Sequence, residues 1–424
     1  MLQQKVKMRI AVFSIHSCPM SQLGTHKNGG MSVYVRETGR ELARRGHAVD
    51  IFTGWRDGDH GMVMELGDGV RLIHLTGGRN SPSSYHQVHS LLPDYFLELE
   101  DHLEREERSY DLVHSHYWLS GVMGEWAREK WNLPHALMFH TIGAAKNENH
   151  PEEQEPELRL QAEKELARSC TRVLATTEEE RRSILRHCDT SPGKVSVVPC
   201  GVNLERFRPL ERSHARHRLG FNQHERVLLF VGRFAPIKGI DRLISAMGNL
   251  KHREDIRLIL VGGDGPRAPE TLQFKEQARE LGVEGNVEFA GGVPQERLPE
   301  YYAAADVLVI PSYYESFGLV ALEALACGTP VLAARVGIAE ELLQDAALGR
   351  ILTDMSPPRL AESIERYLSW LEKHRPSPSR IRSSVLHRQW SEMAEALLEQ
   401  YRGILTLERA EQQGSLNRLA GECK

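Results

Sequence analysis

Two doubly wound α/β domains are the fold class that this sequence predicts, and three observations predict it. Strand-like apolar runs alternate with helical patterns along the whole chain, which is typical of parallel sheets covered by helices. The chain has 424 residues, more than one ordinary hydrophobic core accommodates. A seam with Pro, Gly and a following charged run, beginning at Val198–Asn203, marks a linker near the middle.

The first half alternates short runs rich in β-branched residues with amphipathic helical patterns. Strands are expected at Met8–Ser14, Val49–Thr53, Val70–Leu75, Leu112–Ser115, Ala136–His140, Val173–Thr176 and Val195–Val198. Helices are expected at Ser32–Arg45, Leu91–Glu107, Gly121–Lys130, Pro156–Ser169 and Glu178–His187. Since ligands of such sheets bind beyond the carboxyl ends of the strands, functional residues should follow the strands directly.

The second half repeats this alternation and ends in a long amphipathic helix. Strands are expected at Val227–Gly232, Arg257–Val261, Val287–Ala290, Val307–Ile310 and Val331–Ala334. Gln389–Leu407 is expected to be helical because one apolar stripe runs along it, formed by Met393, Leu397, Leu398, Tyr401, Ile404 and Leu405. We therefore divide the chain into a first domain (1–200), a second domain (209–385), a C-terminal helix (386–407) and a polar tail (408–424) that is expected to be mobile.

The composition narrows the class of protein. Hydrophobic residues make up 41% and charged residues 26%, as in globular proteins, and the net charge of −5 gives no basic bias toward nucleic acid. The six cysteines have neither metal-site nor disulfide spacing, which suits a reducing compartment. The N-terminus shows no signal-peptide pattern, and no apolar run reaches the roughly 18 residues that span a membrane. We expect a cytoplasmic protein without a transmembrane segment, and the sequence leaves open whether it forms a homodimer.

The stretch Pro311–Pro330 organises the site that we expect in the second half. It follows a strand and reads as a loop and then a helix, with Gly318 where the backbone must approach a ligand. Glu315 in the loop and Glu323 in the helix stand eight residues apart. A carboxylate among the apolar neighbours of Glu323 needs a partner, and the hydroxyls of a sugar or ribose would provide one. The amides at the start of this helix form a site for an anion.

Two cations follow an earlier strand of the same half. Arg233 and Lys238 flank a turn that contains Pro, and a nucleotide diphosphate leaving at that point would gain charge that they stabilise. The second half contains no Asp-x-Asp pair that would hold a divalent metal there, so we predict no metal and no other cofactor. Gly263 lies in a Gly-rich turn after the next strand, which lets the backbone approach a ligand.

In the first half, Gly29 and Gly30 open the helix that follows the first strand. Bare amides and the positive end of the helix dipole would let a phosphate or a sugar approach the backbone there. The first strand is not followed by the G-x-G-x-x-G fingerprint of dinucleotide-binding enzymes, which argues against a nicotinamide-dependent oxidoreductase.

These motifs resemble the nucleotide-sugar site of the retaining family-four glycosyltransferases. The resemblance implies a GT-B fold, in which two Rossmann-like domains face each other across a cleft and a C-terminal helix crosses back to the first domain. It implies that Glu315 lies by the donor sugar and that Glu323 holds the ribose. It further implies that the diphosphate meets the backbone after Phe317, at Gly318 and Leu319, that Arg233 and Lys238 clamp it, and that Val293 reads the uracil edge.

Within that family the first half is similar to two subgroups. These are the inositol-phosphate N-acetylglucosaminyltransferases of mycothiol synthesis and the sucrose-phosphate synthases. The resemblance places His140 near the reacting centre, so that the expected catalytic set is His140, Arg233, Lys238 and Glu315. The residues implied around the acceptor are His16, Gln22, Lys27, Asn28, Gly30, Met31, His89, Tyr117, Thr141, Lys146 and Arg159.

Three positions depart from the family pattern. His89 stands where the mycothiol subgroup carries a Lys, and a His carries a charge to a phosphate only near or below pH 6.5. This departure puts a phosphorylated acceptor, inositol phosphate above all, in doubt. Cys200 stands at a linker position that is usually Asn, and the segment Arg335–Ile338 is one Gly short of the usual V-G-G.

We therefore expect a retaining transferase that moves a hexosyl group from UDP-glucose or UDP-N-acetylglucosamine to a small polyol, sugar or sugar phosphate. A glucosyltransferase like sucrose-phosphate synthase or sucrose synthase is one alternative. A sugar-nucleotide-binding protein without activity is another, and the sequence does not separate them. A sugar phosphorylase could share the fold, but it would need a cofactor Lys motif that we do not find in the sequence.

Overall fold

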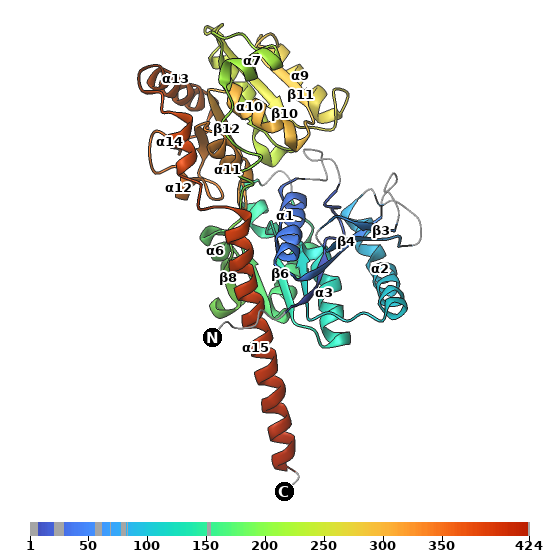
Figure 1. The fold of residues 1–424 in the computed structure, drawn as a ribbon. Helices are drawn as coiled ribbons and strands as arrows, with labels where there is room; N and C mark the ends of the chain where they lie inside the picture. Colours follow the sequence, from blue (N-terminus) through green and yellow to red (C-terminus); the bar gives the residue numbers. More distant parts are fainter. Residues whose placement is uncertain are drawn as a thin grey trace.

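The computed structural model describes residues 7–20, 29–55, 62–67, 69–77, 82, 84–150 and 154–422, with the backbone alone for 408–422. Each half of the chain forms one sheet flanked by helices, and the two units lie one above the other (Figure 1). The predicted α/β class with two doubly wound sheets is confirmed.

The first sheet has eight strands in the order β3-β4-β2-β1-β5-β6-β7-β8. Its strands are β1 (Arg9–Phe13), β2 (Ala48–Gly54), β3 (Val63–Glu65), β4 (Val70–Leu75), β5 (Leu112–His116), β6 (His135–Met138), β7 (Arg172–Ala175) and β8 (Val195–Val197). Only β3 runs antiparallel to its neighbour, at the edge, and the sequence did not predict this short strand. Strand β6 ends two residues before the predicted end, because His140 has φ 61°, outside the range of a strand.

Helices connect these strands. They are α1 (Gly30–Arg44), α2 (Tyr85–Glu106), α3 (Trp118–Trp131), α4 (Gly143–Asn149), α5 (Glu157–Ser169) and α6 (Glu178–His187), with a 3₁₀ turn η1 (Pro192–Lys194). Helix α2 begins earlier than the predicted Leu91, since the Ser84 hydroxyl caps it by accepting the Gln87 N–H at 3.3 Å. Pro93 then lies inside the helix, although its ring favours the first turn.

The second sheet has six parallel strands in the order β11-β10-β9-β12-β13-β14. They are β9 (Arg226–Val231), β10 (Ile256–Val261), β11 (Val287–Gly291), β12 (Val307–Ile310), β13 (Val331–Ala334) and β14 (Gly349–Leu352). Their helices are α8 (Ile240–Asn249), α9 (Pro269–Glu280), α10 (Leu298–Ala304), α11 (Leu319–Ala326), α12 (Ala339–Leu342), α13 (Pro357–His374) and α14 (Pro378–Ser383), with 3₁₀ turns η2 (Pro236–Lys238) and η3 (Gln295–Arg297). The sequence predicted all of these strands except β14.

Helix α7 (Arg212–Leu219) lies where the sequence predicted a charged linker. The Glu211 carboxylate caps it by accepting the Ser213 and His214 N–H groups at 3.1 and 2.6 Å. Arg216 of this helix is fully buried and donates to the carboxylate of Asp306 at 2.9 Å, just before β12. The charges that suggested a linker therefore anchor a helix to the strand that leads into Pro311–Pro330.

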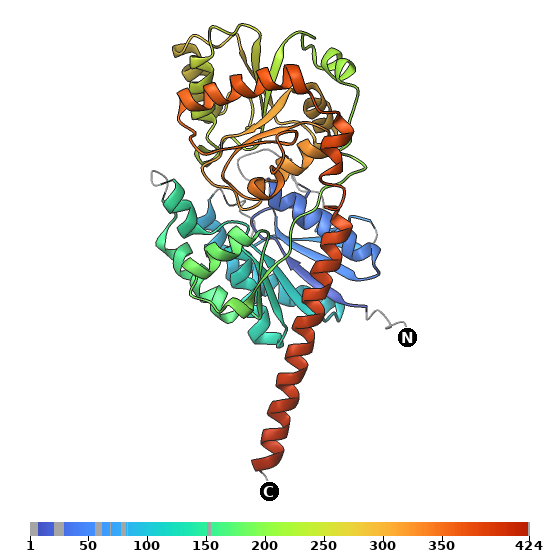
Figure 2. The ribbon, with the colours of Figure 1, turned by 90° about the vertical axis from the view of Figure 1, so that its left-hand side faces the viewer.

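The C-terminal helix α15 (Trp390–Glu422) crosses from the second unit to the first and packs on α1 (Figures 1 and 2). The predicted stripe is confirmed: Met393, Leu397, Leu398, Tyr401 and Ile404 are buried in one core with residues of α1. The predicted end at Leu407 is wrong, since the backbone stays helical through Glu422. Helix formers such as Glu, Ala, Gln and Leu fill that extension, which contains no Pro. Mobility of the tail stays a prediction.

In each sheet the order in which the chain adds strands reverses at one point, and the residues that follow the strands at both points line the cavity at the seam. In the first sheet β1 and β5 are neighbours, and in the second β9 and β12 are, with the chain leaving to opposite sides. Ligands of open α/β sheets bind at such switch points. His16 and Tyr117 follow the first pair of strands, while Arg233 and Glu315 follow the second. The fold thus presents the predicted residues at the two preferred places.

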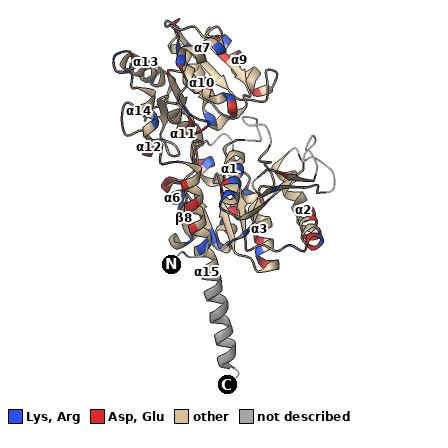
Figure 3. Cartoon of the chain, in the orientation of Figure 1, with Lys and Arg blue, Asp and Glu red and all other residues tan. Residues whose placement is uncertain are grey.

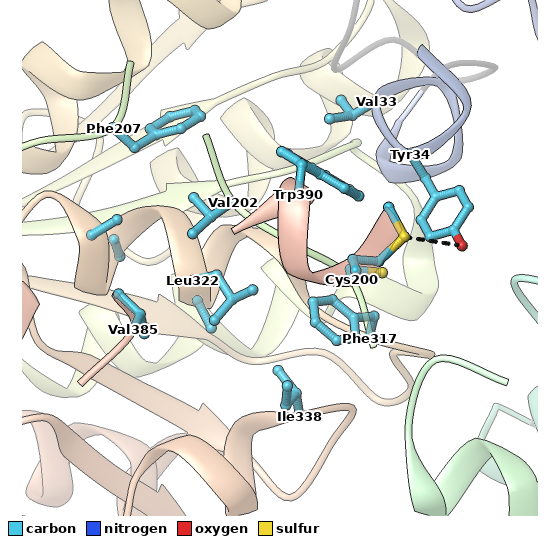
Figure 4. Packing of buried hydrophobic residues seen from close by; sticks show 14 of the residues in the cluster. Val33, Tyr34, Cys200, Val202, Phe207, Phe317, Leu322, Ile338, Val385 and Trp390 are labelled. Atoms are coloured by element: carbon cyan, nitrogen blue, oxygen red, sulfur yellow. Dashed lines mark hydrogen bonds between the residues drawn. The ribbon is translucent and has the colours of Figure 1, made fainter. Parts of the chain in front are cut away.

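One hydrophobic core joins the two units across the seam. Figure 4 shows Val202 and Phe207 of the linker, Leu322 of α11, and Trp390 at the start of α15 in the same cluster as Tyr34 of α1. The Tyr34 hydroxyl points to the Met393 sulfur at 3.9 Å, drawn as a dashed line. Part of the seam between the two units is therefore filled by packed apolar side chains.

Charges of both signs are distributed over the described part of both units (Figure 3). Among the described residues, no helix is long and apolar enough to cross a membrane.

Candidate active site

A cavity of about 490 Å³ lies between the two units and collects most of the predicted residues. From the first half it is lined by His16, Gly29, Gly30, Met31, Tyr117, His140, Thr141, Lys146 and Arg159. From the second half it is lined by Arg233, Lys238, Val293, Glu315, Phe317, Gly318, Leu319 and Glu323. Motifs from distant parts of the sequence therefore meet at one place.

A few predicted residues lie elsewhere. Gly263 is not among the lining residues, although its neighbour Gly262 is, and a Cβ at Gly263 would meet the Phe234 ring at 2.7 Å. The φ of 82° at Gly263 and the nearby Phe234 ring both favour glycine at this position, and its role toward a ligand stays a prediction. His89 on α2 does not line the cavity either, and its ring stacks on Trp118 with centroids 5.6 Å apart. Gln22, Lys27 and Asn28 lie outside the described residues.

The two predicted cations of the second unit stand at the end of β9. Lys238 closes the turn η2 and donates to Glu315 Oε1 at 2.7 Å, and the Ser312 hydroxyl donates to the same oxygen at 2.8 Å. The Arg233 side chain reaches across to the start of α1, where a Cβ on Gly29 would lie 3.5 Å from its Cδ. The Arg233 side chain therefore lies beside the start of α1, at the seam between the two units.

The backbone turn before α11 is shaped for a close approach. Gly318 has φ 97°, which an L side chain rarely adopts, and no side chain caps the helix that follows. A Cβ on Gly337 would stand 2.1 Å from the Phe317 carbonyl oxygen, and that oxygen accepts the Ile338 N–H at 2.8 Å. The segment that is one Gly short of the family pattern therefore still supports this turn. The amides at the start of α11 face the cavity uncapped.

Glu323 is 6% exposed and has the partner that its apolar neighbours require. The Tyr302 hydroxyl donates to Oε2 at 2.8 Å, and the Gln295 amide donates to Oε1 at 3.4 Å. Burial raises the pKa of the Glu323 carboxyl above its usual value. The carboxylate is thus oriented by two side chains and presents its remaining lone pairs to the cavity.

Arg159 forms the wall of the cavity in the first unit. Its side chain is 2% exposed and donates to Glu163 at 2.7 Å, to Glu155 at 2.9 Å and to the carbonyl and hydroxyl of Thr141, both at 2.9 Å. The guanidinium also lies over the Tyr117 ring, 4.8 Å from its centroid. Lys146 donates to Glu155 as well. Two cations and two carboxylates therefore stand together at this end.

His140, which is partly exposed, ends a row of imidazoles whose other members, His116 and His114, are buried. One nitrogen, Nε2, lies 2.8 Å from Nδ1 of His116, and the ring of His114 follows at 4.2 Å from that of His116. Tyr401 of α15 is 2.7 Å from His114 Nδ1. Burial lowers the pKa of His140 and of His114 to about 3. His140 is therefore neutral near pH 7 and can offer a hydrogen bond but no charge.

The loop after β12 touches the first unit directly. The Ser316 hydroxyl donates to the His140 carbonyl, and the Ser316 carbonyl accepts from Thr176 and Thr177 at 3.3 and 3.4 Å. The Ile142 N–H donates to the Tyr314 hydroxyl at 3.5 Å. These bonds tie the loop that carries Glu315 to the first unit beside His140.

Several lining residues were missed from the sequence. They are Ser17, Val33, Tyr34, Tyr85, Gln154, Glu155, Thr176, Cys200, Gln295, Tyr314 and Ser316, among others. Two of them carried a readable signal. Glu155 precedes Arg159 by one helical turn, a spacing at which opposite charges pair, and Thr176 directly follows β7. Gln295 follows β11 in a short turn that contains several polar residues, and the sequence does not show which of them faces the cavity.

Among the described residues, no group of three or more His, Cys, Asp or Glu is placed to hold a metal ion. The prediction that no divalent metal is required stays a prediction.

Comparison with known proteins matches both halves of the chain. The family model described as Glycosyltransferase Family 4 matches residues 28–206, and that of Glycosyl transferases group 1 matches residues 211–380. A D-inositol 3-phosphate glycosyltransferase of Nocardiopsis dassonvillei is 38% identical over 414 residues, which cover 94% of this chain and 95% of that protein. One from Corynebacterium diphtheriae is 37% identical, covering 85% of this chain and 86% of that protein.

Solved structures agree with these matches. A sucrose-phosphate synthase from Thermosynechococcus elongatus superposes with a TM-score of 0.87 at 32% identity, covering 95% of this chain and 100% of that one. The Anabaena protein HepE, solved with UDP and glucose, shares the fold with a TM-score of 0.72 at 20% identity, covering 93% of this chain and 100% of that one. The cavity, its cations and its paired carboxylates thus sit in a GT-B enzyme, and the chain belongs to the glycosyltransferases of group 1 and family 4.

Proposed function

We propose that the chain transfers a hexosyl group from a UDP-sugar to a small polyol, sugar or sugar phosphate, with retention at the anomeric carbon. One observation carries the proposal. A single cavity brings Arg233, Lys238 and Glu323 of the second unit opposite His140 and Arg159 of the first. The donor is assigned to the former set and the acceptor to the latter.

The donor end fits a nucleotide diphosphate. Lys238, Arg233 and the uncapped amides of α11 surround one region with positive charge, and the leaving diphosphate gains negative charge there. Lys238 would exchange Glu315 for a phosphate oxygen, which frees Glu315 for the sugar hydroxyls. Glu323 accepts the ribose hydroxyls. Glucose and N-acetylglucosamine are the donor sugars that we propose, and UDP follows the resemblance of the motifs.

The reacting centre needs no carboxylate nucleophile. Of the glutamates among the described lining residues, Glu155 is paired with Arg159 and Glu323 is bound by Tyr302, while Glu315, once Lys238 turns to the diphosphate, is assigned to the sugar hydroxyls. We assign the base to the leaving group. The bond from the anomeric carbon to the diphosphate oxygen breaks, and the bond to the acceptor oxygen forms on the same face. The acceptor proton passes to the departing phosphate oxygen, and His140 contributes a neutral hydrogen-bonding imidazole.

The acceptor end suits a compact polar molecule. Tyr117 and His16 lie with ring centroids 4.2 Å apart beside Arg159 and Lys146. His89 adds no fixed charge, since burial and then His86 lower its pKa. Inositol phosphate is favoured by the inositol-phosphate glycosyltransferases among the relatives, and fructose 6-phosphate by the similarity to sucrose-phosphate synthase. Unphosphorylated polyols and sugars are the remaining candidate acceptors.

Mass spectrometry of the products tests this proposal. UDP-glucose and UDP-N-acetylglucosamine are each incubated with inositol phosphate, fructose 6-phosphate and simple polyols, and UDP release is followed in parallel. A new glycoside with retained configuration supports the proposal and identifies the acceptor. Binding of UDP without any UDP release would favour a non-catalytic sensor. Binding of NAD and not of UDP would favour an oxidoreductase, and consumption of inorganic phosphate would favour a phosphorylase.

We propose a cytoplasmic enzyme. The described cysteines, at positions 18, 170, 188, 200 and 327, are free and buried, which suits a reducing compartment.

A further inference from the structure

One polar network crosses the seam just beside the ribose end of the donor site. At its centre lies Gln295, 5% exposed, in the turn η3 after β11. Its carbonyl oxygen Oε1 accepts from Arg36 at 2.6 Å and from Arg206 at 2.7 Å. Its amide nitrogen donates to Glu323 at 3.4 Å. A neutral amide thus connects two guanidiniums with a carboxylate.

The two guanidiniums come from different parts of the molecule. Arg36 belongs to α1 of the first unit, whereas Arg206 belongs to the linker. Both lie near the buried carboxylate of Glu37, Arg36 at 3.2 Å and Arg206 at 3.8 Å. The Arg206 contact therefore lies within the linker and the second unit, whereas the Arg36 contact crosses from the first unit to the second.

The geometry leaves Gln295 one orientation. Its oxygen must face the two cations, so its NH₂ group must face Glu323. Charged donors polarise the amide and strengthen the bond that its NH₂ makes. Arg36 and Arg206 also stabilise the ionised form of the buried Glu323 carboxyl across a few ångströms. An ionised and fixed carboxylate is the form that accepts two hydroxyls of a ribose.

We propose that Arg36 acts through Gln295 as a positioning residue for Glu323, so that the ribose of the nucleotide is held fully only when the first unit closes on the donor. This inference rests on the proposed function, because it takes Glu323 as the ribose ligand. Arg36, which does not line the cavity, then contributes to donor affinity without touching the nucleotide. Closure and tight donor binding become one event.

The test compares binding of UDP with binding of 2′,3′-dideoxy-UDP by calorimetry. The variant Arg36→Met keeps the stem of the side chain and removes the charge. We expect it to weaken UDP binding about tenfold, the effect of losing one charge-assisted hydrogen bond, and to change 2′,3′-dideoxy-UDP binding less than about twofold. A purely structural role would weaken both probes equally, which would overturn the proposal, as would unchanged binding of both.

Two further variants make the result specific. Arg40→Met changes another Arg of α1, 3.9 Å from the same Glu37 and 31% exposed, and should leave both affinities unchanged. In a Gln295→Leu background, Arg36→Met should cause no further loss of UDP affinity, because the intermediary is gone. A full additional tenfold loss in that background would contradict a route through Gln295. Thermal unfolding of each variant verifies that it is folded.

The same experiment separates this inference from the proposed function. If the wild-type protein does not bind UDP, or if Glu323→Gln binds UDP as the wild type does, both are overturned. If UDP binding depends on Glu323 but Arg36→Met shows no preference between the two probes, the inference alone fails.

Discussion

Lys238 and Arg159, which we assign to the donor end and the acceptor end of the cavity, are both held by glutamates, but in different ways. Among the described residues Lys238 forms an ion pair only with Glu315, and their side chains are 17% and 14% exposed. Arg159 is 2% exposed and pairs with Glu155 and Glu163. A single pair near solvent can be exchanged for a substrate phosphate, whereas a buried guanidinium between two carboxylates is part of the wall. We therefore propose that the donor displaces the Lys238 pair, whereas Arg159 stays fixed in the wall.

Replacing Arg159 should have the largest effect, and the effect should be on stability. Arg159→Met should lower the free energy of unfolding by about 3–5 kcal/mol, because it leaves Glu163 buried without its cation. Urea unfolding of the variant and the wild type measures the difference. As the control, Arg168→Met changes an exposed Arg of the same helix and should cost less than about 1 kcal/mol. A stability loss at Arg159 no larger than that of the control would show that this cation is not structural.

At the donor end the effect should appear in catalysis. Lys238→Ala should cost about 2–4 kcal/mol of transition-state stabilisation, roughly 30- to 1000-fold in kcat/KM, because the leaving diphosphate loses a cation. Its unfolding midpoint should stay close to that of the wild type, since its pair is single and partly exposed. Steady-state kinetics with the best donor and acceptor measures the loss, and an unchanged kcat/KM would remove Lys238 from the clamp.

Glu180 lies on α6 and accepts a hydrogen bond from Thr176, the residue that contacts the Ser316 carbonyl of the second unit. Its carboxyl should make the stability of the protein depend on pH. Burial raises its pKa to about 7 from 4.5, so the folded state binds the proton more tightly than the unfolded state. The stabilisation is complete below about pH 4.5 and is lost as the pH rises through 7, by up to about 3 kcal/mol. Glu180→Gln lacks this loss. Its stability relative to the wild type should therefore increase from pH 5 to pH 8.

Urea unfolding at both pH values measures that difference, in which groups shared by the two proteins cancel. The bonds that Thr176 donates to Glu180, from its N–H at 2.6 Å and its hydroxyl at 2.5 Å, can be made to the Gln oxygen as well. A stability difference that is the same at pH 5 and pH 8 would mean that the carboxyl titrates normally.

The smallest effect is expected from metal removal. If cations of the protein and helix amides neutralise the diphosphate, EDTA should change the rate less than about twofold in protein prepared without added divalent ions. A large loss that Mg²⁺ or Mn²⁺ restores would show that a metal ion shares the donor end with Lys238.

The residues that we assign to the donor end could be grouped from the sequence because they are local. Glu315, Gly318 and Glu323 belong to one strand, loop and helix, so that spacing alone places them together. The network of Arg36, Arg206 and Gln295 joins three separate elements, and no local pattern reveals such a contact. It became visible only when the two units were placed against each other.

Some predicted elements differ from those in the structure, and the differences have physical reasons. The early start of α2 was hidden by Pro93, which favours a first turn but is tolerated inside this helix. Helix α7 looked like a linker because its charges are buried or capped through tertiary partners such as Asp306. The edge strands β3 and β14 are partly exposed and each carries a charged residue, so they lack the continuous apolar run that marks the buried strands. The left-handed conformation of His140 likewise depends on its surroundings.

A crystal structure of the protein with UDP tests the central claim most directly. We predict the diphosphate within hydrogen-bond distance of Arg233, Lys238 or the first amides of α11, with the ribose hydroxyls on Glu323 and the Lys238–Glu315 pair opened. A nucleotide bound away from Lys238 and Glu323, with that ion pair intact, would contradict the account.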